Sequence, residues 1–100
     1  MNKLTTRTYS HDFQHYTFRE DGWINMTEAA KYFGKETKYF LRLPSTIEYL
    51  EALRNTGESH LLEITRGRSG GTWGHPRLAV VFARWLDMRF AVFCDAVIYA

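Results

Sequence analysis

The stretch that most limits how this chain can fold is residues 64–76, ITRGRSGGTWGHP. Its four glycines free the backbone for tight turns and positive φ angles. The residues on either side are rich in the β-branched and aromatic types that favour strands. We therefore predict a β-hairpin with strands at residues 61–65 and 72–74 and with Trp73 directed into the core. An ordinary solvated turn is the alternative interpretation of this stretch taken alone.

The tip of the predicted hairpin carries Arg66 and Arg68 among glycines. An arginine side chain offers a rigid fork of donors that suits phosphates and the edges of bases in a groove. The rest of the chain decides whether this hairpin serves as the wing of a nucleic-acid-binding domain.

Composition indicates one folded domain. The chain has 100 residues, of which 45% are hydrophobic and 16% aromatic, values typical of a domain with one modest core. Thirteen basic residues stand against eleven acidic ones, so the net charge of +2 permits nucleic-acid binding without predicting it. Cys94 is the single cysteine, which argues against a disulfide framework and fits a reducing cytosol. With no signal peptide and no apolar run of membrane-spanning length, we expect a soluble intracellular domain.

The N-terminal part of the chain predicts a flexible arm followed by two short strands. Residues 1–10 are polar and without periodicity, so we expect an arm, with a single domain over residues 11–100. Residues 11–19 alternate and predict a strand that places Phe13 inward, together with Tyr16 or Phe18. Asp21-Gly22 is a strong hairpin signal, and residues 23–24 form the partner strand.

A helix-turn-helix is predicted next. Asn25 can cap a helix that continues to Phe33, with Glu28 in the reciprocal capping position, and Gly34 ends it. A second helix is expected over residues 36–43. Two short helices joined by a tight glycine turn outline a helix-turn-helix.

Three further helical segments complete the prediction. Ser45 and Glu48 suggest a capping box that opens a helix over residues 45–54, with Ile47, Leu50 and Leu53 facing the core. Pro76 opens another helix with an amphipathic stripe, and Asp87 separates it from an apolar segment that ends the chain. We interpret that apolar end as a sign that this is the N-terminal part of a longer protein, or that the last helix docks on a partner.

Catalytic and metal-binding patterns are not found in the sequence. The four histidines are distributed over different predicted elements, away from any zinc-ligand spacing, and His75 is interpreted as a hydrogen-bonding residue at a helix entry. Cys94 is expected in the core. The glycine-rich stretch lacks the Lys-Ser/Thr pair of a nucleotide-binding loop. We predict no enzymatic activity, no cofactor and no metal.

Several motifs resemble the KilA-N domain, which occurs in proteins of phages and large DNA viruses and is related to the fungal APSES domain. They are DGWINMTEAAKYFGK, YLEAL and GGTWGHPRLAVVFARWL, and the similarity covers about residues 18–98. Gly74 stands where many members have a larger residue, which implies looser strand pairing at this position. The resemblance implies an α+β fold, a helix-turn-helix with an antiparallel β-hairpin wing in the order β-β-α-α-α-β-β-α(-α), and assigns Trp23, Trp73 and Trp85 to the core.

The function implied is binding of double-stranded DNA by a phage or prophage regulator. The residues expected to contact DNA belong to the second helix and the wing: Lys35, Thr37, Lys38, Arg42, Arg66, Arg68, Ser69, Gly70 and Gly71. Ser69 and the amides of Gly70 and Gly71 are expected to hold phosphate oxygens. The resemblance to a phage domain further implies that the protein is located in the cytoplasm of a bacterial host cell. Because the net charge is small, a homodimer or a fused C-terminal domain is expected to add affinity. The alternatives are a protein-interaction module of an antirepressor that acts on another regulator protein and, less favoured, RNA binding, for which the sequence offers no stacking motif.

Overall fold

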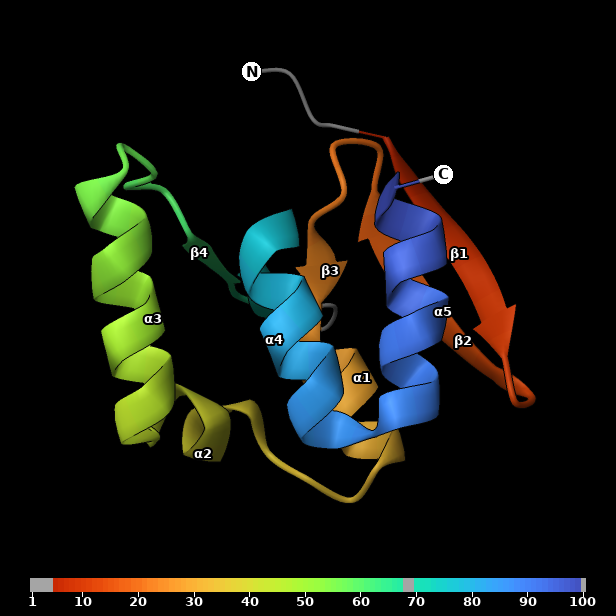
Figure 1. The fold of residues 1–100 in the computed structure, drawn as a ribbon. Helices are drawn as coiled ribbons and strands as arrows, with labels where there is room; N and C mark the ends of the chain where they lie inside the picture. Colours follow the sequence, from red (N-terminus) through yellow and green to blue (C-terminus); the bar gives the residue numbers. More distant parts are fainter. Residues whose placement is uncertain (1–4, 68–69, 100) are drawn as a thin grey trace.

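The computed structural model describes residues 5–67 and 70–99, which form an antiparallel sheet covered by helices (Figure 1). The elements follow in the order β1 (Thr6–His11), β2 (Gln14–Arg19), β3 (Ile24–Asn25), α1 (Met26–Tyr32), α2 (Thr37–Arg42), α3 (Pro44–Asn55), β4 (Leu62–Thr65), β5 (Gly71–Gly74), α4 (Pro76–Leu86) and α5 (Met88–Tyr99). The strand order in the sheet is β1-β2-β3-β5-β4. The α+β class and the predicted succession of helices and hairpin are confirmed, with one strand more than expected. Within the described ranges, no helix combines the length and apolarity needed to cross a bilayer.

The additional strand corrects the prediction for the N-terminal region. Residues 6–10, expected in a flexible arm, belong to β1 and pair with β2. The strand predicted over residues 11–19 is interrupted at Asp12 and Phe13, whose φ angles are 49° and 66°. Phe13, expected inside, is 99% exposed at this turn, whereas Tyr16 and Phe18 are buried as predicted. The turn escaped prediction because it contains neither glycine nor proline.

Phe13→Gly is expected to raise the free energy of unfolding by about 0.5–1 kcal/mol, because a left-handed conformation costs an L-residue more than it costs glycine. The exposed phenyl ring contributes little packing that could be lost. Urea unfolding measures the change. Phe13→Ala keeps the Cβ atom and serves as the control; if it stabilises the protein equally, backbone strain at the turn is not the cause.

The core joins the sheet to the two C-terminal helices. Tyr16 and Phe18 of β2 pack against Phe90 and Phe93 of α5, with ring centroids 4.6 Å apart for Tyr16 and Phe90. Burial raises the pKa of the Tyr16 hydroxyl to about 12. Cys94 lies in the same core, as predicted, and burial raises the pKa of its thiol far above the ordinary value. The thiol is therefore expected to be inert in the folded protein.

The centre of the sheet is a close-packed junction of β3 and β5. Gly74 lies between Ile24 of β3 and Leu62 of β4 and is paired with both strands. A Cβ atom on Gly74 would lie 2.6 Å from Sδ of the buried Met26. The expectation of looser pairing at Gly74 is therefore wrong, because the methionine side chain occupies the space that a larger residue would need.

Three predicted residues lie at helix ends as expected. Asn25 caps α1 by accepting a hydrogen bond from the Glu28 amide, and His75 caps α4 by accepting one from the Arg77 amide. Asp87 ends α4, and its carboxylate accepts hydrogen bonds from two amides at the start of α5.

The start of α3 differs from the prediction. The helix begins at Pro44 with Leu43 as its cap and no capping side chain, so the capping box expected at Ser45 is wrong. Proline is favoured at the first helical position, where its missing amide costs nothing. With this start Thr46, Leu50 and Leu53 are buried, whereas Ile47, expected in the core, is 46% exposed.

Candidate nucleic-acid interface

A glycine turn sets the relative positions of α1 and α2. Gly34 has a φ of 66°, as predicted for the end of a helix. Its amide donates to the carbonyl of Lys31, and the amide of Lys35 donates to the carbonyl of Ala30. This pair of bonds is the Schellman arrangement, which ends a helix sharply and fixes the direction of the chain that follows. The residues that lead into α2 are thereby held against the C-terminal end of α1.

The β4–β5 hairpin is fastened to α1. The Thr72 amide donates to Oγ1 of Thr27 at 2.9 Å. A Cβ atom on Gly71 would lie 3.2 Å from Cβ of Thr27, so a larger residue here would require Thr27 to shift by a few tenths of an ångström. The predicted wing is thus anchored on the same helix that positions α2.

Residues of α1, the turn, α2 and the hairpin line one cavity of about 480 Å³, which we call the lysine groove. Its lining residues are Thr27, Lys31, Gly34, Lys35, Glu36, Thr37, Lys38 and Thr72. Three lysines against one glutamate give this surface a local excess of positive charge. Such local clustering can attract a phosphate backbone although the net charge of the chain is only +2.

Three of the residues predicted to contact DNA, in α2 and the turn before it, line this groove and differ in availability. The Lys35 amine donates to the carbonyl of Trp85 at 2.9 Å and lies 4.7 Å from the centre of its ring. The Lys38 amine lies 3.6 Å from the carboxylate of Glu36, and more than half of its side chain is exposed. Thr37 is only 9% exposed, and its buried hydroxyl has no hydrogen-bond partner in the described part of the chain. Thr37 therefore belongs to the inner wall of the groove.

The other predicted side-chain contacts that the structure describes are not among the residues that line the groove. Arg42 is exposed at the end of α2 and Arg66 at the end of β4, and neither lines the groove. Arg68 and Ser69 lie outside the described residues.

The predicted role of the glycine amides in the hairpin is wrong. The Gly70 amide donates to the carbonyl of Gly67, and the Gly71 amide donates to Oγ1 of Thr65. Both donors are therefore used within the hairpin and are not available to phosphate. A Cβ atom on Gly70 would lie 2.6 Å from the carbonyl oxygen of Thr65, so this glycine is needed for the shape of the hairpin.

Sequence reasoning missed Lys31, Thr27 and Thr72. Lys31 is an exposed lysine in the last turn of α1, a helix in which no DNA-contacting residue was predicted. Thr27 and Lys31 are four residues apart and therefore share one helix face, a signal that was present in the sequence. Thr72 was considered only as a strand residue, because its contact with α1 depends on the tertiary fold.

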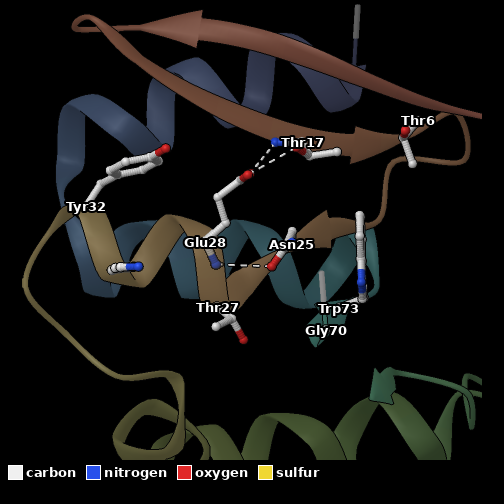
Figure 2. A pocket seen from close by; sticks show the side chains of 9 residues that line it. Thr6, Thr17, Asn25, Thr27, Glu28, Tyr32, Gly70 and Trp73 are labelled. Atoms are coloured by element: carbon white, nitrogen blue, oxygen red, sulfur yellow. Dashed lines mark hydrogen bonds between the residues drawn. The ribbon is translucent and has the colours of Figure 1, made fainter. Parts of the chain in front are cut away.

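A second cavity of about 610 Å³ adjoins the lysine groove and shares Thr27 and Lys31 with it; we call it the tryptophan pocket. It is lined by Thr6, Thr17, Asn25, Thr27, Glu28, Lys31, Tyr32, Gly70 and Trp73 (Figure 2). Trp73, expected in the core, is only half-buried and forms one wall of this pocket. Trp23 is buried and Trp85 packs against the core, as expected.

The motifs that carry the family resemblance meet in space. Asn25 is paired with Trp73, and the rings of Trp23 and His75 are 5.6 Å apart. Gly22, with a φ of 89°, lies so close to Pro76 that a Cβ atom would be 2.9 Å from its Cγ atom. The motifs that begin with DGWIN and GGTWGHP thus form the two sides of the β3–β5 junction, although about fifty residues separate them in the chain.

One of three comparisons with known proteins found a match. No curated protein and no solved structure matches the chain significantly. The sequence model of the KilA-N domain matches residues 9–100, and this family is generally DNA-binding and not enzymatic. Because the match extends over most of the sequence, this chain belongs to the KilA-N domain family.

Proposed function

We propose that this domain binds double-stranded DNA through the lysine groove and the β4–β5 hairpin. The observation that carries the proposal is that α1, the start of α2 and the hairpin contribute to one lysine-lined cavity. In the proposed complex Lys38 and Arg42 contact the major groove or its phosphates, and Lys31 binds the backbone beside them. Arg66 and Arg68 extend to an adjacent stretch of the duplex.

We further propose that the domain serves as the DNA-binding part of a phage or prophage regulator in a bacterial host cell. What supports this role is membership of the KilA-N family. Selection of binding sites from random duplexes tests it. A defined recognised sequence supports a regulator, whereas uniform binding of all sequences contradicts this role.

Replacing Arg66 and Arg68 together with alanine is expected to reduce the salt dependence of duplex binding. Each lost phosphate contact lowers the slope of log K against log salt by about 0.9. Fluorescence anisotropy with a labelled duplex at several salt concentrations measures this slope. A matched variant, Arg7→Ala with Arg54→Ala, removes two exposed arginines that line neither the lysine groove nor the tryptophan pocket. If both double variants keep the slope of the wild-type protein, the assignment of the wing to the interface is wrong.

A protein-interaction module of an antirepressor is the second candidate, and one surface favours it. Met88, Val92 and Tyr99 of α5 are 66%, 70% and 70% exposed, and their spacing places them on one face of the helix. Exposed apolar stripes of this kind often mark interfaces. The same surface would serve a homodimer or the docking of a fused C-terminal domain.

Val92→Arg separates the interaction candidate from DNA binding. If α5 mediates self-association, light scattering after size-exclusion chromatography should show a wild-type dimer and a monomeric variant with unchanged monomer affinity for DNA. If the domain instead forms a complex with a regulator protein and has no affinity for DNA at low salt, this result supports the antirepressor role.

A further inference from the structure

The tryptophan pocket has features that duplex binding through the lysine groove leaves without a role. Its volume of about 610 Å³ lies within the range of about 300–1,000 Å³ that is usual for small-molecule sites. Figure 2 shows one face of the Trp73 ring turned toward Asn25 and the inside of the pocket. A partly exposed indole in the wall of a cavity provides a surface on which a planar group can stack.

The polar groups around this indole suit a ligand with both a planar and an anionic part. Asn25 uses its Oδ1 atom to cap α1, which leaves its amide nitrogen as a donor toward the pocket. Tyr32, 44% exposed, directs its hydroxyl inward from the opposite end (Figure 2). Lys31 lies where the pocket joins the lysine groove, and no ion pair of its amine is found within residues 5–67 and 70–99.

The one acidic group of the pocket is already engaged. The Glu28 carboxylate accepts hydrogen bonds from the amide of Thr17 at 2.6 Å and from its hydroxyl at 3.2 Å. Figure 2 shows this side chain extended toward β2. These two donors hold the carboxylate, which keeps its negative charge, against β2.

We propose that the tryptophan pocket binds a single unpaired nucleotide, with its base stacked on Trp73 and its phosphate beside Lys31. A base and a phosphate are the planar and anionic parts that these two ends of the pocket match. The nucleotide comes either from a bound duplex, as an unpaired residue next to the lysine groove, or from solution as a free mononucleotide. The first source rests on the proposed function, whereas the second requires no affinity for duplex DNA.

Nuclear magnetic resonance of the intact chain tests both sources. The indole N–H signal of Trp73 and the side-chain amide signal of Asn25 are followed while dAMP is added. They are followed again with a short duplex that contains one unpaired adenosine, and with the same duplex fully paired. The indole signals of Trp23 and Trp85, which do not line the pocket, serve as internal controls.

Variants give the quantitative part of the test. The duplex with the unpaired adenosine, or dAMP, is expected to bind wild-type protein roughly 5- to 100-fold more tightly than Trp73→Leu, the range that loss of one stacked base produces. Trp73→Phe should keep most of the affinity. Tyr99→Leu removes an exposed aromatic side chain of α5 that does not line the pocket and should have no effect. A dispersed amide spectrum verifies that each variant is folded.

The outcomes separate this proposal from the proposed function. A preference for the unpaired adenosine that disappears in Trp73→Leu and persists in Trp73→Phe supports the pocket as a site for a nucleotide from the duplex. A shift of the Trp73 signal by dAMP without any duplex binding supports the pocket and contradicts the proposed function. Equal affinity for both duplexes, with no shift of the Trp73 signal by dAMP, overturns the proposal and leaves duplex binding intact.

Discussion

Replacing Gly74 with valine is expected to lower the free energy of unfolding by about 2–3 kcal/mol, as overpacking of a filled core does. The added Cβ atom would lie 2.6 Å from Sδ of Met26, which is fully buried and cannot move into solvent. Gly74 is also paired with strands on both sides, so the backbone has little room to shift. Urea unfolding followed by tryptophan fluorescence measures the loss.

Substituting Met26 tests whether its contact with position 74 causes this loss of stability. Met26→Ala alone should cost about 2–5 kcal/mol because it leaves a cavity. The double variant should lose less than the sum of the two single effects, by about 1 kcal/mol or more, because valine fills space that the methionine vacates. Thr72→Val, in the same strand but away from Met26, is the matched control and should change stability little. Additive effects of the two substitutions would show that this contact does not explain the glycine.

Reversing the charge of Lys31 and Lys38 together is expected to weaken duplex binding roughly a hundredfold at moderate salt. Both side chains line the lysine groove, and glutamate at these positions both removes a phosphate contact and adds repulsion. Lys35 is the poorer choice for this test, because its amine binds the carbonyl of Trp85 and its loss would disturb the end of α4. Anisotropy titrations at two salt concentrations measure the effect.

The control for this experiment is Arg7→Glu with Arg54→Glu. It changes the net charge by the same amount, but Arg7 lies on the outer strand β1, where it lines a separate cavity with residues of α5. Arg54 lies in the last turn of α3, at the end away from α2 (Figure 1). If this control weakens binding as strongly as the groove variant, the attraction depends on total charge and the lysine groove is not the interface.

Local sequence signals predicted most of the secondary structure. Asn25, Gly34, His75 and Asp87 were correctly expected at helix ends, because capping depends on residues near in sequence. The additional strand β1 was missed because it lacks such local signals. Its pairing depends on a turn at Asp12 and Phe13 that has neither glycine nor proline, and its exposed polar side chains show no apolar alternation.

The candidate site could be predicted only in outline. The sequence indicated the cationic residues of the second helix and the hairpin, but not that the hairpin amides bond internally or that Thr37 is buried. Both facts depend on three-dimensional packing. Lys31 lies in the site because α1 contacts the hairpin. This contact joins Thr27 and Thr72, which are 45 positions apart in the chain.

The hydrogen bond between the Thr72 amide and Thr27 has a consequence for how tightly any ligand can be held. Since this bond ties the hairpin to the helix, the conformational entropy lost on docking is smaller than for a loop free to sample many orientations. That loss has already occurred when the chain folds. Removing the Thr27 hydroxyl should therefore weaken the binding of a partner that touches both elements.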